Sequence, residues 1–189
     1  MKKIPTVFER EYENHKVVGI SDTFTSELAK KAFLEGDATL KWDGSCCAII
    51  DGELYKRYDA KNGKTPPAGA IPCCEADPIT GHHPHWVKVD ESNPSDKWFV
   101  EAFKSTFAKC DPTDGTYEAI GKHFQGNPYG MKSDHLHKHG IETEDVERTF
   151  EGIKRYLEDN YVEGIVFWLD GQPIAKIKRS DFGFDWNKR

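Results

Sequence analysis

Asp-Gly pairs that separate alternating apolar segments constrain the fold of this 189-residue chain more than any other feature. The pairs are Asp43-Gly44, Asp51-Gly52 and Asp170-Gly171. An Asp-Gly between two alternating segments is a strong hairpin signal, because both residues tolerate the positive φ of a tight turn. We therefore expect strands at 38–42, 45–51 and 52–59, and a closing hairpin of "VEGIVFWL" and "PIAKIKR" around the third pair.

Two helices are expected from their caps and their apolar spacing. Residues 22–36 predict one helix, with Thr25 or Ser26 as its N-cap and Gly36 as its end. Residues 142–160 predict a second, clearer helix with a capping threonine and one apolar face. That cap and that face are Thr143, Val146, Phe150, Ile153 and Leu157.

The remaining segments are strands, a long loop and one undecided stretch. Residues 17–20 and 115–121 read as strands, whereas the periodicity of 97–106 fits a helix or a strand equally well. Residues 62–84 are rich in glycine and proline and predict a long ordered loop of the kind that often carries function. Antiparallel strands dominate, so we expect an α+β fold with flanking helices and one domain over residues 1–189.

Composition excludes several classes of protein. The 12% aromatic content is too high for a disordered chain, and no apolar run approaches the ~20 residues of a membrane span. The first residues have no apolar stretch of signal-peptide length, so a cytoplasmic protein is expected. A net charge of −6 disfavours a protein that coats nucleic acid non-specifically, although it leaves a local basic groove open.

The cysteines and histidines raise the question of a zinc site. Two cysteine pairs are adjacent in the sequence, Cys46-Cys47 and Cys73-Cys74, and Cys110 stands alone. Structural zinc sites usually space their cysteines by two to four residues, and an adjacent pair on a strand points to opposite sides. The spacing therefore disfavours zinc, and an odd count in adjacent pairs favours reduced thiols over disulfides.

Charged residues recur inside segments that otherwise read as apolar strands. In chain order they are Lys41 and Asp43, Arg57, Glu118, Glu163, and Lys176 and Lys178. The last two lysines are two residues apart, so they point to one face of their strand while Ala175 and Ile177 point to the packed face. An isolated Lys-x-Asp-Gly is usually a solvated hairpin corner, and a strand face with two lysines is usually a wet edge.

Taken in order, however, this series resembles the nucleotidyltransferase motifs of the covalent ligase and capping-enzyme superfamily. The five motifs are "KWDG", "YKRYD", "TYEAIG", "VEGIVFW" and "AKIKR". The segments "KWDGSCCAI", "GHHPHWVKV" and "EAIGKHFQGNPYG" are similar, more narrowly, to the vertebrate-type RNA ligase 1 family of ATP-dependent 5′-to-3′ RNA ligases. The resemblance implies a nucleotidyltransferase (adenylyltransferase) fold, with one such domain over residues 1–189.

One departure from the superfamily pattern bears on the substrate. DNA ligases and capping enzymes commonly follow Lys-x-Asp-Gly with x-Arg, whereas Ser45 and Cys46 stand at those positions here. The missing arginine favours RNA ligase over DNA ligase or capping guanylyltransferase. These two enzymes remain the alternatives of the same chemistry, and a non-catalytic nucleotide- or RNA-binding module is the alternative from another class.

The resemblance implies a role for each motif residue. Lys41 would accept AMP from ATP, and Asp43 would orient it or hold the water shell of a metal ion. Arg57 would contact phosphate or ribose, unless it is an exposed strand arginine. Glu118 would accept hydrogen bonds from the ribose hydroxyls, and Glu163 would bind Mg²⁺ or Mn²⁺.

Lys176 and Lys178 are expected to lower the pKa of the lysine nucleophile and to neutralise charge on the α-phosphate. AMP would pass to an RNA 5′-phosphate and leave as an RNA 3′-hydroxyl attacks, which is a reaction of RNA repair. The expected partners are RNA ends and no membrane, and the oligomeric state stays open with a monomer as the expectation.

Two sets of aromatic residues are left with open roles. Phe124, His137 and His139 are the candidates for stacking on adenine. His82, His85 and Trp86 lie in the segment 71–89 and are candidates for RNA contact, because RNA recognition often uses stacking on such side chains. The alternative for that segment is a packed loop with Trp86 in the core.

Overall fold

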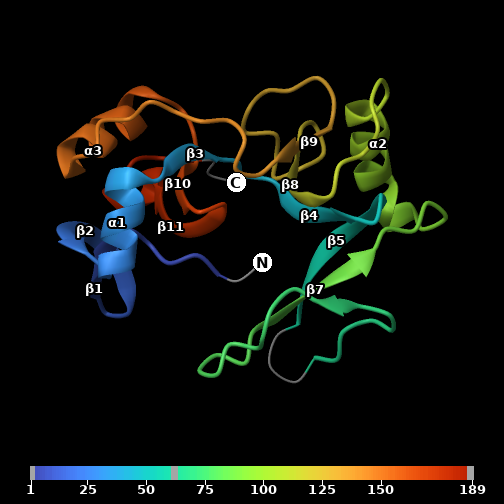
Figure 1. The fold of residues 1–189 in the computed structure, drawn as a ribbon, viewed down its shortest axis with the longest axis horizontal. Coiled ribbons are helices and arrows are strands. Elements are labelled where there is room, and N and C mark those ends of the chain that lie inside the picture. The colour runs from blue at the N-terminus through green and yellow to red at the C-terminus, as the bar shows by residue number, and fades with distance from the viewer. Residues whose placement is uncertain (1–2, 61–63, 187–189) are drawn as a thin grey trace. The chain divides into compact units, whose positions relative to one another are not determined.

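The computed structural model describes residues 3–60 and 64–186, and it is a mixture of antiparallel sheets and a few helices (Figure 1). The α+β expectation is confirmed. The chain forms two compact units, one built on residues 43–139 and the other on residues 4–42 and 140–186. This division leaves the nucleotidyltransferase fold and the single domain over 1–189 as predictions. Among the described residues, no helix has the length and apolar character needed to cross a bilayer.

The first unit contains a six-stranded antiparallel sheet in the order β6-β7-β5-β4-β8-β9. Its strands are β4 (Ser45–Ile50), β5 (Glu53–Ala60), β6 (Ile71–Pro72), β7 (His83–Lys88), β8 (Gly115–Ile120) and β9 (His135–Lys138). The turn between β4 and β5 contains Asp51 and Gly52, with φ of 52° and 76°, as the Asp-Gly pair predicts. The expected loop at 62–84 is mostly irregular where it is described, but it contributes β6 and the start of β7.

One face of this sheet packs against a helix. The undecided stretch is α2 (Lys97–Thr106), which follows a short 3₁₀ turn, η1 (Pro94–Asp96). Strand alternation sends one set of side chains into the core with α2, where each is almost fully buried. The strand residues are Cys47, Ile49, Leu54, Tyr117, Ala119 and Leu136, and they are joined by Phe124 from the loop after β8 and Ala102 from the helix.

The second unit contains a three-stranded sheet in the order β11-β10-β3 and a separate two-stranded ribbon. The sheet strands are β3 (Asp37–Lys41), β10 (Gly164–Leu169) and β11 (Gln172–Lys178), and the ribbon is β1 (Phe8–Glu13) with β2 (Lys16–Phe24). The helices are α1 (Glu27–Glu35), α3 (Phe150–Asp159) and the 3₁₀ turn η2 (Arg179–Phe182). The hairpin around Asp170-Gly171 is therefore confirmed.

The Asp43-Gly44 pair is not a hairpin corner. The strand before it, β3, pairs with β10 in the second unit, whereas the strand after it, β4, pairs with β5 and β8 in the first. Gly44 also has little room, because a Cβ atom there would lie 2.2 Å from the carbonyl oxygen of Ala119. The chain thus leaves one unit and enters the other at this motif.

Both helix predictions need correction at their N-termini. The first helix begins at Glu27 rather than at residue 22, because residues 22–24 belong to β2, where Phe24 pairs with Phe8 of β1. Its N-cap is Ser26, whose side chain accepts a hydrogen bond from the amide of Ala29, and it ends at Gly36 as expected.

The second helix begins at Phe150, and Thr149 rather than Thr143 is its cap. Residues before it are held by β3 instead. Thr143 bridges to Thr39, and the amide of Glu144 donates to the carbonyl of Ala38 at 2.8 Å. Tertiary hydrogen bonds to a neighbouring strand have therefore replaced the first turns of the expected helix.

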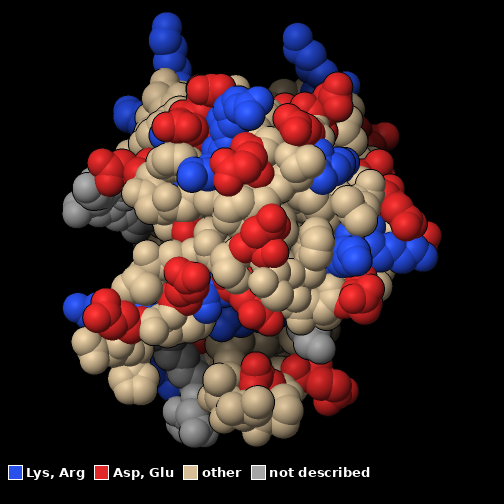
Figure 2. Space-filling model, turned by 90° about the vertical axis from the view of Figure 1, so that its left-hand side faces the viewer, with Lys and Arg blue, Asp and Glu red and all other residues tan. Residues whose placement is uncertain are grey.

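The core of the second unit lies between the three-stranded sheet and its helices. Ala175 and Ile177 of β11 are fully buried there, together with Ile165 and Phe167 of β10. The predicted packed face of "AKIKR" is therefore confirmed. On the face drawn in Figure 2, Lys and Arg side chains are interspersed with Asp and Glu side chains.

Candidate functional site

Strand register gathers three lysines on one face of the sheet in the second unit. Gly164 on the central strand pairs with Lys41 on one side and with Lys178 on the other. One step along the same face, Val166 pairs with Lys176. Because residues two apart share a face, all three lysines lie on the face opposite the core.

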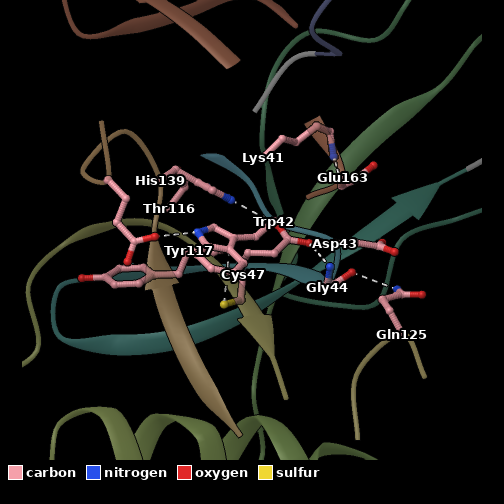
Figure 3. A network of polar contacts seen from close by, with 12 residues as sticks. Lys41, Trp42, Asp43, Gly44, Cys47, Thr116, Tyr117, Gln125, His139 and Glu163 are labelled. Atoms are coloured by element: carbon pink, nitrogen blue, oxygen red, sulfur yellow. Dashed lines mark hydrogen bonds and ion pairs between the residues drawn. The ribbon is translucent and has the colours of Figure 1, made fainter. Parts of the chain in front are cut away.

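Glu163 links two of these lysines. Its Oε2 atom lies 2.5 Å from Nζ of Lys41, and its Oε1 atom lies 2.6 Å from Nζ of Lys178. Only 6% of the Glu163 side chain is exposed, so both of its oxygens are paired in a largely desolvated position. Figure 3 shows the pair of Lys41 and Glu163. A buried carboxylate with two ammonium partners holds both lysines in place.

The backbone at Gly164, next to Glu163, leaves no room for a side chain. A Cβ atom at Gly164 would lie 2.1 Å from the carbonyl oxygen of Ile177, so glycine is required between the two lysine strands. The amide of Lys178 donates to Asp181 at 2.8 Å, and Arg10 forms an ion pair with Asp181 at 2.7 Å. These contacts fix the end of β11, which carries Lys178.

Lys176 differs electrostatically from the other two lysines. Burial, together with the charges of Lys41 and Lys178, lowers its pKa to about 8, whereas Glu163 opposes the shift. A substantial fraction of Lys176 is therefore neutral near pH 8. The three lysines form a concentrated positive region with one carboxylate, which suits a polyphosphate ligand.

The first unit has a second group of polar side chains, around a cleft of about 480 Å³. Glu118 on β8 pairs with Cys46 on β4, and Arg57 lies on β5, the strand on the other side of β4. The cleft is lined by Gly44, Ser45, Cys46, Lys56, Arg57, Asp59, Phe99, Glu118 and Gln125. Thus Arg57 and Glu118, predicted for nucleotide binding from separate motifs, line the same cleft.

Glu118 is held at both oxygens. Its Oε1 atom accepts a hydrogen bond from the amide of Gly44 at 3.1 Å, and its Oε2 atom lies 3.1 Å from Nε2 of His139. The other ring nitrogen of His139 lies 3.0 Å from the hydroxyl of Thr116 (Figure 3). Because a carboxylate only accepts, Nε2 of His139 carries the proton in this contact.

The "GNPYG" segment and Gln125, the residue before it, form hydrogen bonds with the Asp-Gly of the Lys-x-Asp-Gly motif. The amide of Asp43 donates to the hydroxyl of Tyr129 at 2.6 Å, and Gln125 donates to the carbonyl of Gly44 at 2.8 Å (Figure 3). Neither Gln125 nor Tyr129 was singled out from the sequence. The only available signal was the quoted segment itself, whose turn places Gln125 and Asn127 at positive φ.

Cys46 stands where DNA ligases and capping enzymes commonly have arginine. Burial, with the nearby charge of Glu118, raises the pKa of this thiol to about 12. The thiol is therefore neutral at physiological pH and offers no thiolate nucleophile. Its neighbour Cys47 is fully buried on the other face of β4.

Arg57 is not the exposed strand arginine of the alternative interpretation. Only 19% of its side chain is exposed, and its Nε atom donates to Asp59 at 2.7 Å. His82 approaches the same carboxylate at 3.3 Å. Arg57 thus presents a positively charged group to the cleft with its orientation set by Asp59.

Three of the aromatic candidates are corrected by burial. Phe124 is 6% exposed and packs edge-on against Phe99 in the core, so it has no face for adenine. His85 and Trp86 are also buried in β7, as the packed-loop alternative predicts. His82 and the adenine-stacking role of His137 stay predictions, whereas His139 lies against Glu118.

The predicted metal ligands are two carboxylates on different units, Asp43 and Glu163. Among the residues that the structure describes, no group of three or more His, Cys, Asp or Glu side chains lies close enough to hold a metal ion. Mg²⁺ is commonly held by one or two carboxylates together with substrate phosphates, so a single carboxylate is compatible with such a site.

Comparison with known proteins gives distant relatives of one kind. Over 158 residues the chain is 27% identical to RNA ligase 1 of Pongo abelii, a match that covers 64% of this chain and 47% of that protein. It is 24% identical to RNA ligase 1 of Rattus norvegicus and of Danio rerio, with 98% of this chain and 82% of each relative covered. No family model matches the chain. The chain is thus related, at a distance, to proteins named RNA ligase 1.

Proposed function

We propose that this chain, as a distant relative of RNA ligase 1, is an ATP-dependent RNA ligase that joins an RNA 5′-phosphate to an RNA 3′-hydroxyl. The observation that carries the proposal is the cluster of Lys41, Lys176 and Lys178 around Glu163. Such a cluster supplies both a lysine nucleophile and the cations that a phosphoryl-type transfer requires.

In the first step, the amine of Lys41 attacks the α-phosphorus of ATP. A phosphoramidate bond forms between Nζ and phosphorus, the bond to the β-phosphate oxygen breaks, and pyrophosphate leaves. Lys41 must lose its ammonium proton to solvent beforehand, and its ion pair with Glu163 must break for this to happen. Charge from the incoming phosphates competes for the same lysines and weakens that pairing.

Lys176 and Lys178 stabilise the negative charge that develops on the α-phosphate oxygens. Both lie on the same strand face as Lys41, and Lys178 is held by Asp181 and Glu163. Preorganised cations of this kind contribute more in a partly desolvated position than in water.

Glu118 and Arg57, which line the cleft of the first unit, are the residues proposed for nucleotide binding there. Glu118 accepts hydrogen bonds from the ribose hydroxyls, and Arg57 binds phosphate or ribose through guanidinium donors. The two acceptors of Glu118 now used by Gly44 and His139 retain further lone pairs for these hydroxyls.

In the later steps, AMP passes to the RNA 5′-phosphate, and an RNA 3′-hydroxyl then displaces it to form the phosphodiester bond. Mg²⁺ or Mn²⁺, for which Glu163 and Asp43 are the proposed carboxylates, would neutralise phosphate charge during these transfers. The net reaction consumes one ATP and releases AMP and pyrophosphate for each bond formed.

The decisive experiment is incubation with α-labelled ATP and a divalent metal, followed by denaturing electrophoresis. A labelled protein band that survives denaturation is expected with ATP and not with α-labelled GTP, because the proposal is an adenylyltransferase. Labelling by GTP would support a capping guanylyltransferase instead. Absence of labelling with either nucleotide would favour the non-catalytic binding module.

A further inference from the structure

We propose that Trp98, His123 and Asp134 form a platform beside the cleft that holds an unpaired nucleotide of the RNA substrate. The rings of Trp98 and His123 are parallel, with an interplanar angle of 6° and centroids 3.4 Å apart. The proposal rests on the proposed function for the identity of the nucleic acid, but none of these three residues belongs to the adenylylation motifs.

A buried carboxylate sets the orientation of the imidazole. Asp134 is only 5% exposed, and its Oδ2 atom accepts a hydrogen bond from Nδ1 of His123 at 2.7 Å. Its Oδ1 atom accepts from the backbone amide of His123 at 3.0 Å. Side chain and backbone are therefore fixed by the same carboxylate, which keeps the ring against Trp98.

This arrangement leaves Nε2 of His123 available. A carboxylate only accepts, so the proton of a neutral His123 lies on Nδ1 and Nε2 becomes an acceptor. No described residue forms a hydrogen bond with Nε2, and 27% of the His123 side chain is exposed. A ribose 2′-hydroxyl is a donor that fits this acceptor, and it is the group that separates RNA from DNA.

The platform lies next to the cleft that the proposed function assigns to ATP. Phe99 lines the cleft and follows Trp98 on α2, while Gln125 lines it two residues after His123. A second ring contact, between Phe99 and Phe124 at 5.3 Å, holds the same two segments together. A nucleotide on the platform therefore lies beside the cleft rather than within it.

The chemistry of the platform matches a nucleotide in three respects. Because His123 and the ammonium of Lys97 both lie against the Trp98 ring, the ring offered to a base is that of His123, which is partly exposed. Nε2 accepts from the 2′-hydroxyl, and the ammonium of Lys97, which lies 4.4 Å from the ring centroid of Trp98, supplies a cation for phosphate. A packing role alone requires neither the free nitrogen nor the nearby cation.

The test measures the binding of a short fluorescent single-stranded RNA, and of its DNA counterpart, by anisotropy with the full chain. His123→Ala removes the stacking ring, and Trp98→Ala removes the ring that supports it, so each is expected to weaken RNA binding roughly tenfold, the scale of one lost stacking partner. His123→Phe keeps a ring but removes Nε2, so it should lower the preference for RNA over DNA by roughly fivefold. Tyr12→Ala, which removes an aromatic side chain that is 64% exposed in the other unit, is the matched control and should leave binding unchanged.

Label transfer from ATP to the protein, measured in the same preparations, separates the two proposals. Normal labelling with weakened RNA binding in the platform variants supports the platform. Absence of labelling in every preparation, including the wild type, would contradict the proposed function. The RNA-binding measurements would still test the platform in that case. The platform would be overturned if Trp98→Ala and the conservative His123→Phe bound RNA within twofold of wild type and kept the same preference for RNA over DNA. The contact between Trp98 and His123 would then serve packing alone.

Discussion

The Oε2 atom of Glu163 lies 2.5 Å from the Nζ atom of Lys41, although the two residues stand 122 positions apart in the chain. This ion pair holds the side chain of Lys41 in place. Under the proposed mechanism, the pair must be broken before Lys41 can act as a nucleophile.

If Lys41 is the nucleophile, the protein should gain the mass of one AMP on Lys41 after incubation with ATP and a divalent metal. Lys41→Ala should abolish the adduct, while Lys104→Ala, an exposed lysine of the first unit, should form it normally. Peptide mapping by mass spectrometry is the measurement. An adduct on Lys176, whose lowered pKa makes it the strongest competitor, would show that the first motif has been assigned wrongly.

Lys176 and Lys178 are expected to act on the rate of this step. Replacing either with Met should slow adenylylation by roughly 10²-fold or more, the usual scale for one preorganised electrostatic donor. Folding should be kept, because methionine preserves the aliphatic stem that packs on the sheet. Single-turnover labelling rates, with thermal melts as the folding control, make the comparison. Near-normal rates in both variants would mean that this strand face is simply solvated.

The lowered pKa of Lys176 predicts a particular dependence of stability on pH. Its ordinary value is 10.5 and its folded value is about 8, so between these pH values the unfolded chain binds the extra proton. The free energy of unfolding should therefore rise from about pH 8 to about pH 10.5. Below pH 8 this group should add no further pH dependence, because its destabilising effect is complete there.

Lys176→Met should remove that rise and should make the protein more stable at neutral pH. We expect a gain of roughly 1 to 2 kcal/mol, less than the full shift implies because the side chain is partly accessible to solvent. Urea unfolding of both proteins at several pH values provides the measurement, and the difference between the two curves cancels the other titrating groups. Parallel curves would contradict the assigned shift.

Glu118 is expected to act on nucleotide binding and not on the lysine itself. Glu118→Ala removes the acceptor for the ribose hydroxyls and leaves the Gly44 amide and His139 without their partner. The KM for ATP should rise roughly tenfold or more, the scale of a hydrogen bond to a charged group. Glu91→Ala is the matched control, since that exposed glutamate pairs only with a surface lysine. An unchanged KM in Glu118→Ala would remove this residue from the nucleotide site.

Strand alternation explains why much of the lysine face was predictable. Lys176 and Lys178 had to share a face once Ala175 and Ile177 were assigned to the core, because the strand period is two. The pairing of Lys41 with Glu163 was not predictable, since it depends on β3 lying beside β10. No local pattern specifies which of several strands becomes the neighbour.

Burial decided the points at which local patterns failed. Phe124 lies in a polar loop, but it packs against Phe99 of α2. This contact could not be predicted, because the sequence of residues 97–106 fitted a helix or a strand equally well. Thr143 and Thr149 are both acceptable helix caps. The bridge from Thr143 to Thr39 selects the later one, through a contact that only the folded chain contains.

The choice of nucleic acid gives the last prediction. Enzyme that already carries AMP should seal a 5′-phosphorylated RNA end to an RNA 3′-hydroxyl much better than it seals an all-DNA equivalent. The reasons are the relationship to proteins named RNA ligase 1 and the presence of Cys46 in place of the arginine common in DNA ligases. Because the chain has a net charge of −6, few phosphates should be neutralised by lysine and arginine, so sealing should fall only moderately as salt rises. Gel-based sealing assays over a salt series measure both effects. Efficient sealing of nicked duplex DNA, with RNA ends left unjoined, would overturn the RNA assignment while leaving the adenylylation chemistry in place.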